Sequence, residues 1–214
     1  MTLFSGGMDS ATALFRCIGE YGPEKVIAVS FRYPSKHNAH ELKAARAVLE
    51  YLSPHAPRHQ LVDITSCFEG FKSNLLQSGG EIPEGHYSAD NMKLTVVPGR
   101  NFIFLAVAAG LAESLGVGKI CIAAHHGDNY IYPDCRETFI RTAGESIALS
   151  TEGRVTLASP FTGMTKNEIA YIGKNLGVPF VLTRSCYKNQ EKPCGKCGTC
   201  TERREALAAI GIVE

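Results

Sequence analysis

Short apolar runs rich in β-branched residues alternate with helix-like patterns along almost the whole chain. Four runs have this character: Lys25–Phe31, Gln60–Ile64, Lys119–Ala124 and Arg154–Ala158. Runs of this length and composition are typical of strands that a parallel sheet buries on both faces. Because parallel strands need long crossover connections, the alternation predicts an α/β fold with three layers, αβα, around a mainly parallel sheet. We expect ligands to bind at the carboxyl ends of these strands.

The segments between the runs carry apolar residues at helical spacing. One amphipathic helix is predicted from five of them: Leu42, Ala45, Val48, Leu49 and Leu52. The segment Asn101–Leu115 predicts a longer apolar helix that packs against the sheet over most of its surface. Thr165–Glu168 (TKNE) has the form of a capping box, which predicts a helix start there and a helix end at Gly177.

Composition and charge narrow the classes of function. The chain has 214 residues, which suits one large domain or one domain with an appendage, and 22 Lys and Arg balance 21 Asp and Glu. No run of like charges offers a grip on long nucleic acid, so a small-molecule substrate is favoured. The most apolar stretch, Phe102–Ala112, is shorter than the roughly 20 residues of a membrane helix. Residues 1–6 do not resemble a signal peptide, so we expect a reducing, cytoplasmic location without disulfides.

A glycine loop connects the first apolar residues to the first helical pattern. Leu3-Phe4 is followed by Ser5–Ser10 (SGGMDS) and then by an apolar helical stretch. Two glycines allow a tight turn, and the helix start adds unpaired N–H donors and a positive dipole end, an arrangement that suits a pyrophosphate. Beside phosphates, the Asp9 carboxylate would either hold a bridging Mg²⁺ or cap the helix. The alternative is a plain Ser/Gly turn with Asp9 or Ser10 as N-cap.

Four of the eight cysteines lie together near the end of the chain: Cys186, Cys194, Cys197 and Cys200. Four thiolates saturate a tetrahedral Zn²⁺ and leave no open position, so this spacing predicts a structural zinc site. An iron–sulfur cluster also accepts such spacing, and unliganded thiols are the third possibility. We therefore divide the chain into an α/β domain, residues 1–183, and a cysteine segment, residues 184–214. The cysteine segment is expected to end in a short helix, Thr201–Ile212.

The other cysteines are expected to play different parts. Cys17, Cys67 and Cys121 are single and are interpreted as small core residues. Cys135 lies beside Arg136, where a thiolate could be stabilised. The polar, Gly- and Pro-containing segment Ser78–Asp90 predicts a long loop near the site or a mobile lid.

Five stretches, in this order, resemble the 7-cyano-7-deazaguanine synthase family of PP-loop ATP pyrophosphatases. They are the loop at residues 5–10, Val97–Asn101 (VPGRN), Tyr132–Arg136 (YPDCR), residues 160–169 (PFTGMTKNEI) and the segment from Ser185 to Cys197. The resemblance implies an adenine nucleotide alpha hydrolase-like fold and a dimeric, zinc-containing cytoplasmic enzyme of the queuosine precursor pathway. Such an enzyme acts on 7-carboxy-7-deazaguanine and ammonia. ATP adenylates the acid, ammonia displaces AMP, and a second ATP activates the amide so that a nitrile forms.

The glycine loop, the motifs and the resemblance together predict the site residues. The expected nucleotide contacts are Phe4, Ser5, Gly6, Gly7, Met8, Asp9, Ser10, Ala11 and Thr12. The expected substrate contacts are Arg100, Asn101, Asp128, Tyr132, Asp134 and Arg136. The residues assigned to catalysis are Asp9, Ser10, Arg100, Asp134 and Arg136. The expected cofactors are ATP, Mg²⁺ and Zn²⁺.

Two histidine clusters have open interpretations. His125 and His126 would form a second metal site or, as is commoner near a nucleotide, hydrogen-bond to substrate or solvent. His37, His40 and Glu41 would either open a helix or contact a ligand.

The chain departs from the family pattern at three positions. The family usually carries an aromatic residue where Arg184 stands, an acidic residue at Gly198, and Ser or Thr at Ala11. Arg184 and Gly198, with the His-rich loop before Asp128, keep alternative functions open: a relative could stop at the amide, or couple the activated carboxyl to an amine on a protein or nucleic acid, which would then be its partner. A PP-loop tRNA-modifying enzyme and a non-enzymatic zinc-ribbon module are further alternatives.

Overall fold

A computed structural model describes residues 1–86 and 90–213 and has five parallel strands at its centre. The strands are β1 (Thr2–Leu3), β2 (Ile27–Arg32), β3 (Arg58–Asp63), β4 (Lys119–Cys121) and β5 (Thr156–Ala158). Their order in the sheet is β3-β2-β1-β4-β5, and every pairing is parallel. The predicted parallel sheet is confirmed, and each of the four apolar runs contributes a strand.

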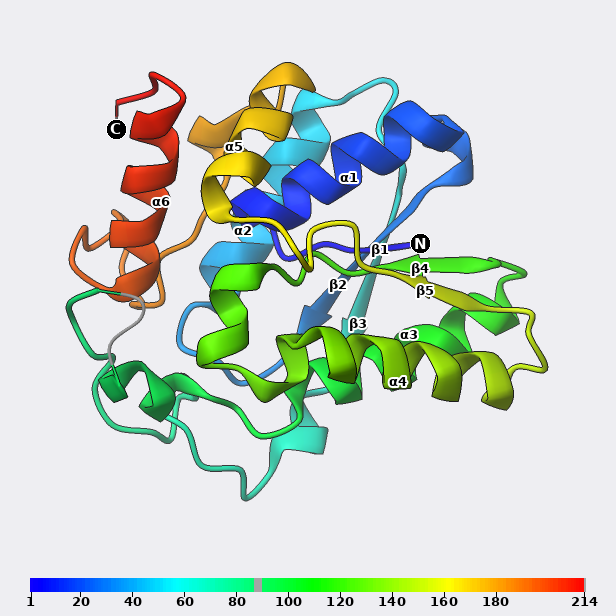
Figure 1. The fold of residues 1–214 in the computed structure, drawn as a ribbon, viewed down its shortest axis with the longest axis horizontal. Coiled ribbons are helices and arrows are strands. Elements are labelled where there is room, and N and C mark those ends of the chain that lie inside the picture. The colour runs from blue at the N-terminus through cyan, green and yellow to red at the C-terminus, as the bar shows by residue number, and fades with distance from the viewer. Residues whose placement is uncertain (87–89, 214) are drawn as a thin grey trace.

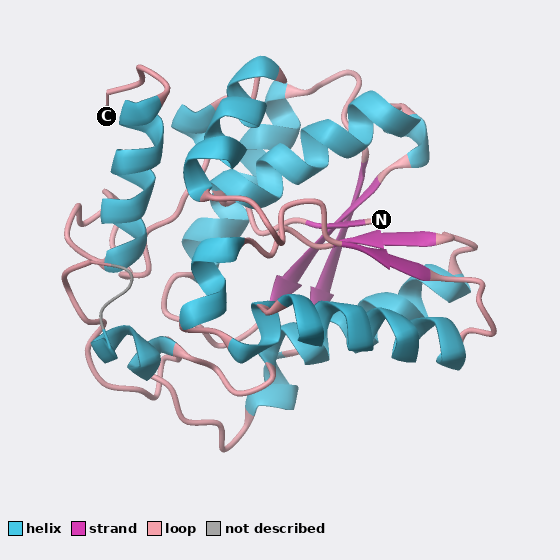
Figure 2. Cartoon of the chain, viewed as in Figure 1, coloured by secondary structure: helices cyan, strands magenta, loops and turns pink. Residues whose placement is uncertain are grey.

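Helices cover both faces of the sheet (Figures 1 and 2). They are α1 (Met8–Tyr21), α2 (Asn38–Tyr51), α3 (Arg100–Ser114), α4 (Glu137–Ser150), α5 (Lys166–Asn175) and α6 (Gly198–Ala209). One buried cluster joins the sheet to α1, α2, α5 and α6, and a second joins it to α3 and α4. The three-layer αβα architecture is therefore confirmed.

Local sequence signals explain where several helices start. The capping box before α5 forms as predicted: Glu168 N donates to Thr165 Oγ1, and Thr165 N donates to Glu168 Oε2 at 2.8 Å. Helix α3 follows Gly99, whose φ of 62° places it in the left-handed region that favours glycine. Helix α4 was not predicted, although Ile140, Ala143 and Ile147 are spaced as one helical face and are all buried.

The C-terminal helix starts earlier than predicted. Helix α6 begins at Gly198 instead of Thr201, so Cys200 lies in its first turn. Its Arg203 side chain is buried and donates to Thr183 Oγ1 and to the Phe180 carbonyl, each at 2.7 Å. These bonds fasten the cysteine segment to the α/β domain. The division of the chain at residue 183 stays a prediction.

Part of the predicted loop Ser78–Asp90 lies outside the described residues, namely 87–89. Within the described part, Glu84 forms an antiparallel bridge with Cys197, and Gly85 N donates to the Lys196 carbonyl at 3.0 Å. This part of the loop thus lies against the cysteine segment. Across residues 1–86 and 90–213, no helix combines the length and the apolar character that crossing a bilayer requires.

Candidate functional site

A large cavity opens where the strand order reverses. Strands β1 and β4 are neighbours, but their following loops lead to opposite sides of the sheet, which is the position where ligands bind in folds of this kind. The loops after β1, β2 and β4, the start of α3 and the cysteine segment all line the cavity. Its space, counted with the open mouth, is about 1180 Å³.

The glycine loop forms one wall of this cavity. Ser5 Oγ accepts from Gly7 N at 3.3 Å and lies 3.1 Å from Ser10 Oγ. Gly6 has a φ of 84°, and a Cβ there would lie 2.6 Å from both the Ala45 nitrogen and the Glu41 carbonyl oxygen of α2. Only glycine fits at this position because the obstacle is backbone.

The N-cap of α1 is Gly7, and no side chain caps the first turn. The interpretation of Asp9 or Ser10 as N-cap is therefore wrong, because both residues already lie inside the helix. The uncapped N–H groups and the positive end of the helix dipole face the cavity, as an anion site requires.

A buried ion pair joins this loop to the start of α5. Lys166 Nζ lies 2.6 Å from Asp9 Oδ2 and 3.3 Å from Glu202 Oε2 of α6. Burial raises the pKa of the Asp9 carboxyl, but Lys166, His125 and Arg203 outweigh burial and hold it below the ordinary value. Burial likewise lowers the pKa of Lys166, and the surrounding carboxylates hold it above the ordinary value. Asp9 Oδ1 is buried and has no partner among the described residues.

His125 belongs to the same network. Its Nδ1 accepts from Gly127 N at 3.1 Å, and its Nε2 lies 3.2 Å from Lys166 Nζ. Nε2 faces Asp128 Oδ2 at 3.4 Å and Asp9 Oδ2 at 3.8 Å. His126 is exposed, and the one cluster of potential metal ligands among the described residues consists of cysteines. A second metal site at these histidines therefore finds no support.

Arg100 stands on another side of the cavity among tyrosines. Its guanidinium lies 5.9 Å from the centre of the Tyr132 ring, and Nη1 donates to the Tyr33 hydroxyl at 3.5 Å. The Tyr132 hydroxyl lies 3.2 Å from that of Tyr187, whose pKa burial raises well above the ordinary value. No carboxylate among the described residues forms an ion pair with Arg100, so this cation is available to an anionic ligand.

The residues of the stretch Tyr132–Arg136 have different positions: some line the cavity and others only support the neighbouring elements. The Asp134 carboxylate accepts from Asn101 N at 2.8 Å, so it caps the start of α3. The Arg136 side chain is exposed and donates to the Asn129 carbonyl. Cys135 is buried, and burial together with Asp128 and Asp134 raises the pKa of its thiol. The expected thiolate beside Arg136 is therefore wrong, because the arginine points elsewhere.

Most of the predicted site residues lie together. Those that line the cavity are Phe4, Ser5, Gly7, Met8, Asp9, Ser10, Arg100, Asn101, Asp128 and Tyr132. Gly6 shapes the turn behind the loop, whereas Ala11 and Thr12 are buried within α1. Asp134 and Arg136 do not line the cavity.

Three further cavity residues, His37, Glu41 and His125, had a ligand contact among their open interpretations. Four others had no predicted role in the site: Lys166, Arg184, Tyr187 and Thr199. The sequence held one signal for Lys166. It lies within the capping-box motif, so its ammonium was predicted at the amino end of a helix, near the carboxyl edge of the sheet.

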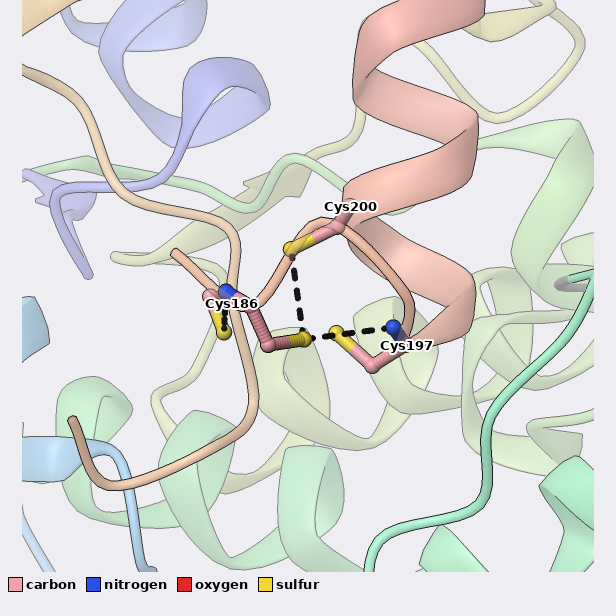
Figure 3. A group of neighbouring side chains, drawn as sticks. Cys186, Cys197 and Cys200 are labelled. Atoms are coloured by element: carbon pink, nitrogen blue, oxygen red, sulfur yellow. Dashed lines mark hydrogen bonds between the residues drawn. The ribbon is translucent and has the colours of Figure 1, made fainter. Parts of the chain in front are cut away.

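The four cysteine sulfurs converge at the start of α6. All lie within 4.8 Å of one another, and Cys194 Sγ is 3.9 Å from Cys200 Sγ. Figure 3 shows the side chains of Cys186, Cys197 and Cys200 turned toward one another. Cys194 N donates to Cys186 Sγ, and Cys197 N donates to Cys194 Sγ, contacts that favour thiolates. Tetrahedral zinc with bonds of about 2.3 Å spaces sulfurs by about 3.8 Å, so the cluster could hold a metal ion.

The single cysteines only partly match expectation. Cys121 is buried and Cys17 is half-buried, but Cys67 is exposed, so the interpretation of Cys67 as a core residue is wrong. Cys67 lies in a short 3₁₀ turn, Thr65–Phe68, that follows β3 on the surface.

Comparison with known proteins gives consistent matches. The family model described as "Queuosine biosynthesis protein QueC" matches residues 1–211. A 7-cyano-7-deazaguanine synthase from Porphyromonas gingivalis is 49% identical over 99% of this chain and 93% of its own. The synthase from Desulfotalea psychrophila is 45% identical over 96% and 91%, respectively. The fold resembles NMN synthetase from Francisella tularensis, with a TM-score of 0.54 at 15% identity, over 98% of this chain and 76% of that one.

The Lys166–Asp9 pair leads to a prediction about stability. Lys166→Met leaves the Asp9 carboxylate in the cavity wall without its ammonium partner, and at neutral pH the free energy of unfolding should fall by about 3 kcal/mol. Because the folded-state pKa of Asp9 is lowered, the pair stabilises the protein above the ordinary carboxyl pKa and loses this contribution as the pH falls through the folded-state pKa. Urea unfolding should therefore show the gap between wild type and variant narrowing below about pH 4.

The double variant Asp9→Asn, Lys166→Met is the control, because it removes the Asp9 charge together with the ammonium and leaves only Glu202 unpaired, so it should recover part of the lost stability. A gap that stays constant down to pH 3, or a double variant less stable than Lys166→Met, would contradict the ion-pair assignment.

Proposed function

The chain belongs to the QueC family of queuosine biosynthesis proteins, and we propose that it uses ATP to convert 7-carboxy-7-deazaguanine and ammonia to 7-cyano-7-deazaguanine. It is thus an enzyme, and the proposed class is ligase. One observation carries the proposal for the site: an uncapped glycine loop and an unpaired arginine line the same cavity. The loop suits the phosphates of ATP, and Arg100 suits the carboxylate that ATP must activate.

The chemistry requires two anions to meet. A carboxylate is a poor electrophile, so one of its oxygens attacks the α-phosphate of ATP, and the bond between the α- and β-phosphates breaks to release pyrophosphate. We assign the leaving pyrophosphate to the N–H groups at Gly7 and the start of α1, with Ser5 and Ser10 as hydroxyl donors. Arg100 would hold the substrate carboxylate and offset its negative charge as it approaches the phosphate.

Asp9 and Lys166 are proposed to serve the phosphates. The unpartnered Oδ1 of Asp9 is an oxygen ligand of the kind that Mg²⁺ prefers, so Asp9 fits a Mg²⁺ that accompanies ATP. Such an ion would neutralise phosphate charge when bound. Lys166 contacts the same carboxylate, and we expect its ammonium to contact phosphate oxygens when ATP is bound. Glu202 holds the Lys166 ammonium at the cavity wall.

The remaining steps use the same site. Ammonia attacks the acyl adenylate carbon, and AMP leaves to give the amide. A second ATP adenylates the amide oxygen, and loss of that oxygen with AMP and of two protons from nitrogen leaves the nitrile. Asp134 and Arg136 were predicted as catalytic and substrate residues; their positions support an indirect part, in which Asp134 holds the start of α3 and thereby places Arg100.

Product identification tests the function. The purified protein with ATP, Mg²⁺, ammonium and 7-carboxy-7-deazaguanine should yield the nitrile, detected by mass spectrometry. Ser5→Ala and Asp9→Ala should lower pyrophosphate release by about 100-fold each, as loss of oxyanion-type donors or of a metal ligand does. The exposed Ser146 provides a control, since Ser146→Ala should leave the rate unchanged.

Other products separate the remaining candidates. Accumulated amide, or a mass increase on a protein or nucleic acid, would identify one of the deviant relatives and overturn the nitrile-forming proposal. The departure at Arg184 has a local structural explanation, because its guanidinium donates to the Glu191 and Gln190 carbonyls and so holds the turn after Cys186. Recovery of the unchanged acid alone would reject every form of the proposed activity.

We assign zinc to the cysteine cluster, because four sulfurs at tetrahedral spacing leave no open position for chemistry. Metal analysis of the purified protein should find about one zinc per chain and no visible absorbance of an iron–sulfur cluster. Cys197→Ser should lose the metal and lower Tm by roughly 10 °C, because several kcal/mol of metal-binding free energy is lost.

Cys67→Ser is the matched control, because Cys67 is exposed and lies outside the cluster, so metal content and Tm should not change. Iron in the preparation, instead of zinc, would contradict the zinc assignment and identify the site as an iron–sulfur cluster. A metal-free protein with the Tm of wild type would show that the thiols need no ligand.

The proposed homodimer would use an apolar face of α3. Phe102 is 54% exposed, and the exposed Ala106 and Gly110 follow it at helical spacing, so a helix of another copy could approach closely. Phe102→Glu should shift the mass measured by sedimentation from dimer to monomer. Val181→Glu, at a position 86% exposed in a different part of the chain, should not. A dimer that survives Phe102→Glu would place the interface elsewhere.

The proposed location is the cytoplasm, where a thiolate cluster stays reduced.

A further inference from the structure

The two anion sites do not account for the whole cavity. The loop after β2 and the first turn of α2 form another part of its wall, and they bring His37, Asn38 and Glu41 to the lining. Asn38 is satisfied by the protein itself, since it donates to the Phe31 carbonyl and accepts from Tyr33 N. His37 and Glu41 also line the cavity, and His37 Nδ1 has no hydrogen-bond partner among the described residues.

His37 and Glu41 form a pair that offers only acceptors. His37 Nε2 lies 3.4 Å from Glu41 Oε1, which requires the proton of the neutral ring on Nε2. Nδ1 is then a lone-pair acceptor; it has no partner among the described residues, and the side chain is only 2% exposed. The Glu41 carboxylate is 16% exposed and keeps free lone pairs. A ligand that satisfies these groups must bring hydrogen-bond donors.

His40, three positions after His37, has no such role. It is half-buried, it does not line the cavity, and its Nε2 lies 3.1 Å from Asn189 Oδ1. Of the three residues whose role the sequence left open, the fold directs two to the cavity and one to the surface.

Aromatic side chains connect this acceptor pair to Arg100. The His37 ring lies 5.0 Å from the Tyr187 ring, and the Tyr187 hydroxyl lies 3.2 Å from that of Tyr132. The Tyr132 ring in turn faces Arg100 at 5.9 Å. Tyr33 lies near both charged groups. Burial raises the pKa of the Tyr33 hydroxyl most, Arg100 lowers that pKa by a smaller amount, and Glu41 raises it by a still smaller amount. The cavity thus has an acceptor end, a cationic end and aromatic walls between them.

We propose that Glu41, held by His37, binds the N1–H and 2-amino edge of the deazaguanine while Arg100 binds its carboxylate. This inference rests on the proposed function and names the specificity-determining residues of its acid site. The acid carries a carboxylate on its five-membered ring and three N–H donors on the far edge of its six-membered ring, which matches a cation at one end and acceptors at the other. Flat rings between these ends suit the aromatic walls.

The same pair discriminates against adenine. Adenine presents its amino group between two ring nitrogens that are acceptors, and these would face the Glu41 oxygens without a proton between them. ATP therefore cannot use the acceptor end without leaving buried acceptors unpaired. The pair keeps the base of ATP from occupying the position of the acid.

The test is Glu41→Gln, a substitution of nearly equal shape that puts an amide N–H₂ where the donors of the base arrive. We expect kcat/KM for 7-carboxy-7-deazaguanine to fall by about 100-fold and the KM for ATP to stay within about twofold, since only hydrogen bonds to the base are lost. Wild type should also prefer this acid to 7-carboxy-7-deazahypoxanthine, which lacks the 2-amino group, and the variant should lose most of that preference. Glu50→Gln, the same change at an exposed position of α2, should behave as wild type.

Three outcomes would overturn the inference. The first is an unchanged kcat/KM of Glu41→Gln for the acid. The second is a KM of Glu41→Gln for ATP that rises by the same factor as its KM for the acid. The third is a Glu41→Gln enzyme that still prefers the acid to the analogue without the amino group as strongly as wild type does. Thermal unfolding of each variant checks that it folds, and Glu41→Asp, which keeps the charge and retracts it, should lose less than Glu41→Gln.

Calorimetric binding of the acid to wild type separates this inference from the proposed function. If wild type neither binds nor converts the acid, the proposed function fails, and the inference fails with it. If wild type does both and Glu41→Gln does too, only the inference fails.

Discussion

The buried contact between Lys166 and Asp9 holds the site together. Asp9 belongs to the first turn after β1, Lys166 to the start of α5 and Glu202 to α6, so three segments far apart in sequence meet at one ammonium. A buried charge without a partner is costly, and this arrangement leaves each charge compensated only when all three segments are in place. The geometry of the glycine loop therefore depends on residues more than 150 positions away from it.

The cysteine cluster acts on the cavity through the same connection. Cys197 and Cys200 flank the start of α6, where Thr199 lines the cavity and Glu202 contacts Lys166. On the other side of the cluster, Tyr187 directly follows Cys186 and lines the cavity. The cysteine cluster can therefore influence the cavity without touching a ligand, because it lies in the segment that forms one wall.

Local patterns predicted the fold well, and contiguous motifs predicted part of the site. The apolar runs, the capping box at Thr165 and the glycine loop carry their structural reason within a few residues, so they are readable from sequence. The strand order and the meeting of His37, Lys166 and Tyr187 result from packing between distant segments, which no local pattern contains. Adjacency in sequence was even misleading at Cys135 and Arg136, because successive side chains leave a 3₁₀ turn in different directions.

The bonds of Arg203 to residues 180 and 183 have a consequence for the protein during its synthesis. A nascent chain that has emerged from the ribosome only to Thr183 already contains all five strands and the glycine loop, but not Tyr187, Thr199 or Glu202. Its glycine loop is present while one wall of the cavity is still missing. The segment that completes the cavity wall is therefore translated after all the strands, and the cavity closes only when that segment has joined them.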